Sequence, residues 1–210
     1  MRKVIMLTAT SVWMAIPAAS IPQAARRWTQ GLWMVLMAVW VVGFFMTRQT
    51  ARRQTSSSRV WQMGILLLGA WMLFGRGTGI AWLDAAAIPC AAAPALAGLA
   101  ITLAGVAFAI WARVTLGANW SGVITVKHGH TLVRRGPYRI VRHPIYTGIL
   151  MALAGTALTK GAVRSLLALP VLALGFWLKM LTEERFMVEK FGEEYLRYRY
   201  QVRRLVPFLF

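Results

Sequence analysis

The chain has 210 residues, of which 58% are hydrophobic and only 14% are charged, and it contains ten tryptophans. This is more apolar surface than a soluble domain of such a size can bury, so the composition excludes an ordinary water-soluble protein and favours a bilayer. The net charge of +18 does not indicate nucleic-acid binding, because lipid headgroups and the enrichment of basic residues in cytosolic loops account for it. With Cys90 as the single cysteine, neither a disulfide framework nor a thiolate metal cluster can form within one chain.

The apolar runs predict an all-α fold, a polytopic transmembrane helix bundle of five or six spans. A hydrocarbon core of ~30 Å requires ~20 residues of helix, and five runs approach or exceed this length. The five runs are residues 28–47, 60–82, 88–112, 145–159 and 165–181. A sixth candidate, residues 4–21, is either a first span or a cleaved signal peptide. We expect a retained span, because no clean small-x-small cleavage site precedes a soluble mature sequence.

The last two runs are the shortest and follow each other closely. The run 145–159 has fewer residues than a full crossing requires, and Pro170 kinks or thins the run 165–181. We expect these two runs to form a tight hairpin through Lys160 and Gly161.

Basic residues concentrate in three segments between and after the spans. Four arginines lie in residues 48–59, six basic residues lie in 113–143, and six more lie in 182–210. Because short loops rich in lysine and arginine remain on the cytosolic side, we expect all three segments in the cytosol. This orientation leaves Arg26 and Arg27 outside, and the inverted orientation would expose the three larger groups instead.

These assignments divide the chain into two regions. Residues 1–112 form N-terminal transmembrane helices, and residues 113–210 form a second region that contains the hairpin 145–181 and a cytosolic tail. The protein is then an integral, multi-pass membrane protein.

The stretch GPYRIVRHPIYTG stands out because it places polar groups directly before an apolar run. Proline disfavours helix at the preceding residue and suits the first helical turn, so His143 should be a turn residue and Pro144 should begin a helix. The first turn of a helix offers unpaired N–H groups and partial positive charge, and Arg139 and Arg142 lie beside it. The stretch therefore predicts an anion site. Anchoring of both arginines to lipid phosphates is the alternative.

Five of the six acidic residues of the chain lie within residues 183–194. Glu183 and Glu184 directly follow the run 165–181, where the negative end of a helix dipole disfavours carboxylates. If this helix continues, Lys179 lies on the same face as Glu183. Such an acidic pair could bind a cationic amine or ribose hydroxyls, and the alternative is a solvated helix with many charges.

Metal and classical dinucleotide sites are not expected. His128 and His130 form an H-x-H pair that could be joined by His143, but no carboxylate at a fixed local spacing completes a ligand set. The glycine-rich fingerprint of a dinucleotide-binding fold is missing, and GRGTG at 75–79 lies in the wrong context.

The combination LGANWS, GHTLV, GPY and RHPIYTG, followed by EE and FGEEYLRY, resembles the isoprenylcysteine carboxyl methyltransferase and phospholipid methyltransferase group of membrane enzymes. The resemblance covers about residues 116–210. It implies that residues 113–210 are the catalytic region, with S-adenosylmethionine as the cofactor in a cytosolic pocket formed by the segment 113–143 and the tail. It also implies a lipidic or prenylated substrate that enters from the surrounding membrane lipids. By motif position the cofactor contacts fall on His130, Thr131, Leu132, Val133, Tyr138, His143, Pro144, Ile145, Tyr146 and Glu183, with Glu184 adjacent.

The resemblance also bears on the substrate and on the catalytic residues, for which we expect Arg142 and Lys179. Lys179 stands where the isoprenylcysteine enzymes resemble one another in having a substrate-contacting arginine. A carboxylate acceptor is ionised at pH 7 and needs no base, whereas the ammonium of phosphatidylethanolamine must first lose a proton. We therefore expect carboxyl methylation of an isoprenylcysteine-like substrate. The alternatives are phospholipid N-methylation and a non-enzymatic membrane scaffold or transporter, in which Arg76 and Arg142 would be pathway residues.

Overall fold

The computed structural model describes residues 20–45, 50–53, 56–117, 125–127 and 132–206. Two of the predicted cofactor residues, His130 and Thr131, lie outside the described residues, as does His128. Most of the predicted segment 4–21 also lies outside them, so the choice between a span and a signal peptide stays open.

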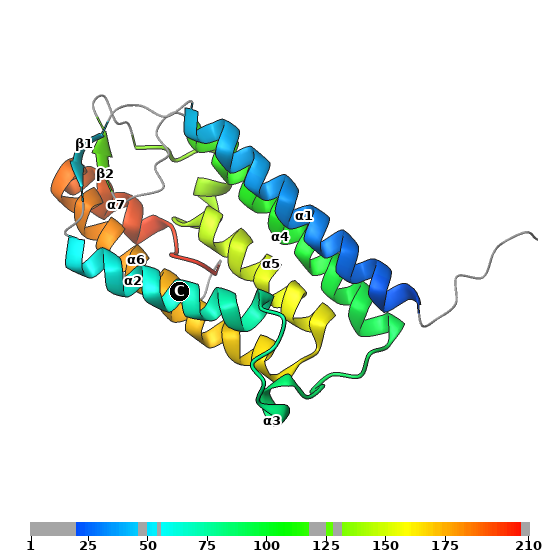
Figure 1. Ribbon diagram of the computed structural model, residues 1–210. Coiled ribbons are helices and arrows are strands. Elements are labelled where there is room, and N and C mark those ends of the chain that lie inside the picture. Colours follow the sequence, from blue (N-terminus) through cyan, green and yellow to red (C-terminus); the bar gives the residue numbers. More distant parts are fainter. Residues whose placement is uncertain (1–19, 46–49, 54–55, 118–124, 128–131, 207–210) are drawn as a thin grey trace, which may run out of the picture.

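The described chain consists of helices and one short sheet (Figure 1). The long helices are α1 (Ser20–Phe45), α2 (Ser56–Phe74), α4 (Ala92–Leu116), α5 (Pro144–Lys160) and α6 (Val163–Phe191). The short ones are α3 (Ala81–Asp84), the 3-10 helix η2 (Gly136–Arg139) and α7 (Glu193–Gln201). Strands β1 (Thr50–Arg53) and β2 (Thr125–Lys127) pair in antiparallel fashion. The predicted all-α fold is thus confirmed for the helix bundle, but the sheet was not predicted.

Each clear predicted span corresponds to one long helix, with corrected boundaries. The run expected at 28–47 begins at Ser20, because Arg26 and Arg27 lie within α1 rather than in a loop. The run expected at 60–82 ends at Phe74, where Gly75 and its neighbours leave the helix. Within the described residues, three helices, α1, α4 and α6, are long and apolar enough to cross a membrane by length and composition.

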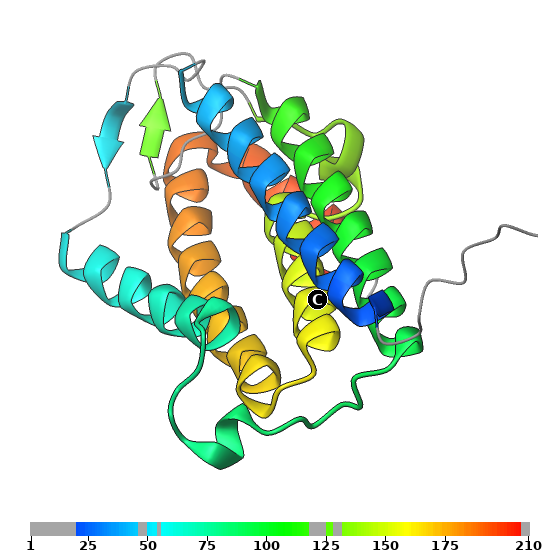
Figure 2. The same ribbon diagram turned by 45° about the vertical axis from the view of Figure 1, so that its right-hand side comes forward.

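The long helices lie in the spatial order α1, α4, α5, α6, α2 (Figures 1 and 2). The helix α5 lies between the pair α1 and α4 on one side and the pair α2 and α6 on the other. Because α5 is central, its first turn is surrounded by the other elements at one end of the bundle. We call this the site end, and the opposite end, where α5 meets α6, the hairpin end.

Four glycines bring α4 and α5 into backbone contact. They lie at Gly98 and Gly105 of α4 and at Gly148 and Gly155 of α5, with a spacing of seven residues on each helix. A Cβ atom added at Gly105 would lie 2.5 Å from the amide nitrogen of Ala152. Small residues permit close packing of this kind between membrane helices. The seam therefore fixes the position of the first turn of α5 against α4.

Basic side chains at the hairpin end bind the carbonyl groups that end the helices. Gly161 adopts a left-handed conformation with φ 70° and joins α5 to α6, so the predicted hairpin through Lys160 and Gly161 is confirmed. The guanidinium of Arg26 donates to carbonyls in the last turn of α5 at 3.4 and 3.5 Å. Lys160 and Arg164 donate to the carbonyls of Leu73 and Met72 at the end of α2. A positive side chain near the C-terminal end of a helix interacts favourably with the helix dipole.

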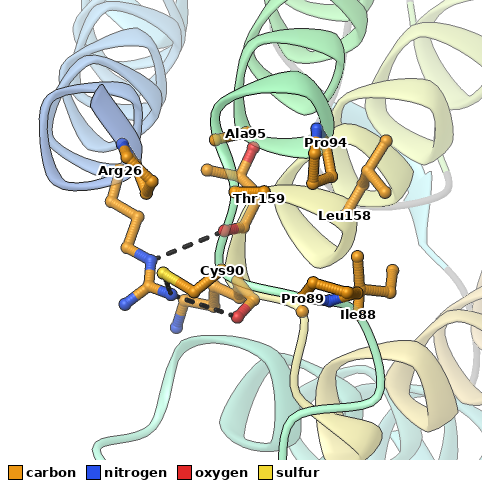
Figure 3. Close-up of a pocket in the computed structure, with 12 residues that line it drawn as sticks. Arg26, Ile88, Pro89, Cys90, Pro94, Ala95, Leu158 and Thr159 are labelled. Atoms are coloured by element: carbon orange, nitrogen blue, oxygen red, sulfur yellow. Dashed lines mark hydrogen bonds between the residues drawn. The ribbon is translucent and has the colours of Figure 1, made fainter. Parts of the chain in front are cut away.

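A shallow pocket lies at the hairpin end, between α1, the start of α4 and the end of α5 (Figure 3). Arg26 crosses it and also contacts the sulfur of Cys90 at 3.7 Å. This pocket lies at the opposite end of α5 from His143 and Pro144, about 25 Å away at ~1.5 Å per helical residue. Through these contacts Arg26 joins α1 to the end of α5, and we assign no ligand to the pocket.

Candidate functional site

The site end is built around the first turn of α5. His143 is the N-cap residue, with φ −121° and ψ 59°, and Pro144 occupies the first helical position. This confirms the expected turn at His143 and the expected helix start at Pro144. The N–H groups of Ile145 and Tyr146 have no intrahelical acceptor and lie at the positive end of the helix. The first turn can therefore bind an anion.

Glu183 faces this first turn from α6. Its Oε1 atom accepts a hydrogen bond from the hydroxyl of Tyr146 at 2.5 Å, and its Oε2 atom lies 3.6 Å from Nδ1 of His143. The rings of His143 and Tyr146 are stacked, with centroids 5.7 Å apart and planes inclined by 17°. The side chain of Glu183 remains 22% exposed. The carboxylate, the aromatic pair and the helix terminus thus converge on one partly open region.

Glu184 is the neighbour of Glu183 in sequence but faces a different environment, and its side chain is only 5% exposed. Arg142 donates to its Oε1 atom at 2.9 and 3.0 Å, and Nε2 of His143 lies 3.2 Å from the same oxygen. Arg204 approaches both carboxylate oxygens, at 3.1 Å to Oε1 and 2.8 Å to Oε2. Glu184 is therefore a buried ion-pair centre that joins three parts of the chain.

Lys179 lies one helical turn before Glu183. The helix α6 continues without a break to Phe191, which confirms the expectation that these two residues share one helix. The ammonium nitrogen of Lys179 lies 5.5 Å from the centroid of the Tyr146 ring, in a cation–π arrangement. The structure thus brings a cation to the same aromatic ring that binds Glu183.

Tyr138 lies in η2 and is buried in a cluster with Ala112 and Ile145. The hydroxyl of Tyr198 donates to its backbone carbonyl at 2.6 Å. Burial raises the pKa of the Tyr138 hydroxyl far above its usual range and raises the pKa of Tyr198 to about 12. Both phenols therefore keep their protons at neutral pH. The partly buried Val133 packs against this cluster.

The structure brings most of the described site residues together, and Leu132 is half-buried at the start of the segment that leads to η2. Arg142, expected to be catalytic, turns toward Glu184, with a further hydrogen bond at 2.9 Å to the carbonyl of Arg199 and a short one to that of Val202. A direct role for Arg142 in catalysis stays a prediction.

The sequence reasoning missed Arg204 and Tyr198 as parts of the site end. The sequence contains no local signal for either contact, because their partners lie 20 and 60 residues away. A tail rich in arginine and tyrosine next to a paired glutamate was the one available hint.

Among the described residues, no group of three or more histidine, cysteine, aspartate or glutamate side chains gathers as metal ligands. His128 and His130 lie outside these residues, so the alternative of a histidine site around His143 is not tested.

Residues 94–194 match the family described as Phospholipid methyltransferase. A probable protein-S-isoprenylcysteine O-methyltransferase of Oryza sativa subsp. indica is 31% identical over 115 residues, which cover 53% of this chain and 60% of that protein. The Protein-S-isoprenylcysteine O-methyltransferase of Schizosaccharomyces pombe is 36% identical over 101 residues, which cover 47% of this chain and 43% of that protein.

The matched part of this chain spans roughly half of the length of these curated relatives. A match that covers more of this chain is to the Cobalt-zinc-cadmium resistance protein CzcN of Cupriavidus metallidurans. It is 34% identical over 145 residues, which cover 66% of this chain and 59% of that protein.

Proposed function

Since residues 94–194 belong to the family of isoprenylcysteine and phospholipid membrane methyltransferases, we propose that the protein is an S-adenosylmethionine-dependent methyltransferase. The single observation that carries this proposal is the convergence of Glu183, the stacked pair His143 and Tyr146, and the first turn of α5. Three of the predicted cofactor residues, His143, Tyr146 and Glu183, are in mutual contact there, and this supports the proposal.

The chemistry of these groups fits the proposed cofactor. S-adenosylmethionine has a carboxylate, an ammonium, ribose hydroxyls and an aromatic base. The N–H groups of Ile145 and Tyr146 suit its carboxylate, and the partly exposed Glu183 suits its ammonium or hydroxyls through charge-assisted hydrogen bonds. Val133 and Tyr138 of the neighbouring cluster suit the base. Leu132 precedes Val133 directly and is assigned to the same surface by motif position.

When bound, the cofactor supplies an electrophilic methyl group on a sulfonium sulfur. The work of the protein is to align an acceptor with this methyl group and to exclude water. We assign the alignment of the cofactor to Glu183 and to the first turn of α5, and the binding of the acceptor to Lys179. The cluster around Tyr138 and Ile145 closes the site against water.

We propose an isoprenylcysteine-like carboxylate as the acceptor. Lys179 supports this choice, because its ammonium attracts a carboxylate and repels the ammonium of phosphatidylethanolamine. No strong base is required for a carboxylate that is already ionised. The curated relatives in rice and fission yeast are named for isoprenylcysteine methylation. The family description favours the second candidate, phospholipid N-methylation.

We further propose that five or six helices cross the membrane and that the site end faces the cytosol. The apolar part of α2, Val60–Phe74, and α5 are shorter than α1, α4 and α6. Large apolar side chains are exposed on α1 and α2, which suits contact with lipid. Examples are Trp28, Met34, Phe45, Trp61, Leu67 and Trp71. The basic segments around the site end support a cytosolic orientation.

Calorimetry in lipid nanodiscs with S-adenosylhomocysteine, the demethylated product, tests the cofactor site. We expect Glu183→Gln to weaken binding by roughly 10-fold or more, because a charge-assisted hydrogen bond contributes about 1.5–3 kcal/mol. Glu193→Gln, at an exposed position in the first turn of α7, is the matched control and should bind as the wild type does. Equal binding by both variants would reject the assigned site. Wild-type protein that transports a solute and has no cofactor affinity would instead favour the transporter alternative.

A further inference from the structure

The segment 202–206, which we call the C-terminal strap, runs alongside the residues that lead into α5. The amides of Arg142 and His143 donate to carbonyls of the strap at 2.7 and 3.1 Å. The hydroxyl of Thr147, in the first turns of α5, donates to the carbonyl of Leu205 at 2.8 Å. The strap therefore covers the N-terminus of α5 from one side and determines which N–H groups there remain available.

A buried carboxylate, Glu184, adds side-chain ion pairs to these contacts of the strap. The guanidinium of Arg204 lies against Glu184 with a side chain that is only 14% exposed, and it also stacks over the ring of Trp177 at 4.5 Å. Arg142 approaches Glu184 from the segment that precedes α5. Glu184 thus ties α6, the strap and the residues before α5 together through two arginines.

The same carboxylate also sets the orientation of His143. The Nε2 atom of this ring lies 3.2 Å from Glu184, while its Nδ1 atom lies 3.6 Å from Glu183. The ring is therefore fixed between two adjacent glutamates, with its face against Tyr146. A movement of Glu184 would therefore change the orientation of the His143 ring in the site.

From this geometry we infer that Arg204 and Glu184 are positioning residues, which hold the C-terminal strap and His143 in the arrangement that binds the cofactor. Glu183 is then the carboxylate that faces the ligand, and Glu184 acts only through its neighbours. This inference rests on the proposed function, because it concerns the same site. It assigns different roles to two residues that the sequence presents as a pair.

The test compares Arg204→Met with wild type and with Arg197→Met, an exposed arginine of α7. Methionine retains an apolar stem that can cover Trp177 but removes both hydrogen bonds to Glu184. We expect the KM for S-adenosylmethionine to rise on the order of 10-fold or more, because only protein molecules whose strap lies against the N-terminus of α5 are competent to bind the cofactor. The kcat at saturating cofactor should change less than about twofold. Arg204→Lys, which keeps the charge, should recover part of the affinity.

Hydrogen exchange supplies the second measurement. The amides of Arg142 and His143 should exchange faster in Arg204→Met and remain as in wild type in Arg197→Met, because only the former releases the strap. If exchange accelerates while the KM stays unchanged, the strap has no part in cofactor binding and the inference fails. If neither quantity changes, Arg204 does not hold the strap. If the wild type itself binds no cofactor, the proposed function fails first. Should Arg204→Met not accumulate, Arg204→Lys gives the same two measurements with a smaller perturbation.

Discussion

Replacing Lys179 with methionine tests whether the acceptor is a carboxylate. Lys179 lies on α6 beside the site, one helical turn before Glu183. The side chain is partly buried and contacts the Tyr146 ring with its ammonium at 5.5 Å. Methionine keeps a stem of similar length, and the loss of the cation–π contact itself should cost about 0.5–1 kcal/mol of stability. The variant should therefore fold, and its kinetics can be compared directly with those of wild type.

If Lys179 pairs with the acceptor carboxylate, the substitution removes a charge-assisted contact of about 1.5–3 kcal/mol. This corresponds to a roughly 10- to 150-fold fall in kcat/KM for the acceptor, with little change in cofactor affinity. Radiolabelled methyl transfer to a prenylcysteine in nanodiscs measures it. Lys190→Met, an exposed lysine near the end of the same helix, serves as the control.

Lys179→Arg should retain activity on a carboxylate, since arginine keeps the charge and adds a bidentate fork. Unchanged prenylcysteine turnover in Lys179→Met would refute this reasoning. Faster methylation of an amine lipid than of prenylcysteine by the wild type would also refute it, and phospholipid N-methylation would then replace the isoprenylcysteine proposal.

Two further predictions concern the bundle. Gly105→Ala should lower the free energy of unfolding by about 1–3 kcal/mol, because its Cβ atom would lie 2.5 Å from a backbone nitrogen of α5. A Cβ atom added at Gly64 meets no atom within 4 Å, so Gly64→Ala should be neutral or stabilising by up to about 1 kcal/mol. Thermal unfolding of both variants and the wild type measures these differences. In a Cys90→Ala background, Ser56→Cys at the site end should resist an impermeant thiol reagent in intact cells, whereas Trp82→Cys at the hairpin end should react; the reverse pattern would overturn the proposed orientation.

Local signals allowed some elements to be predicted closely. The start of α5 depends on Pro144 and its end on Gly161, and the predicted run 145–159 differs from the observed helix by one residue at each end. Proline at the first helical position and a left-handed glycine after the last turn act through their own backbone geometry. Such residues specify a helix boundary without help from distant parts of the chain.

The boundaries and contacts that were missed depend on distant partners. The predicted span 28–47 leaves Arg26 before the helix, but within α1 Arg26 binds carbonyls at the end of α5, more than 130 residues away. The antiparallel pairing of β1 with β2 joins the connection before α2 to the connection after α4. Hydropathy along the chain carries no information on either contact, since each one requires the bundle to have formed.

The pair Glu183–Glu184 shows how a local pattern can indicate a site and yet leave its chemistry undetermined. Consecutive residues of an α-helix point about 100° apart, so two adjacent carboxylates face largely different surroundings, although the His143 ring here lies between them. Here one faces the aromatic ring of Tyr146 and remains partly open, while the other faces the C-terminal strap and is buried among arginines. A buried carboxylate is tolerated only when it is well paired, so Glu184 needs Arg204 and Arg142 for its own stability. The ion pairs that make the buried charge permissible also join the C-terminal strap to the residues before α5. This connection is the basis for our proposal that Arg204 influences a ligand at the start of α5.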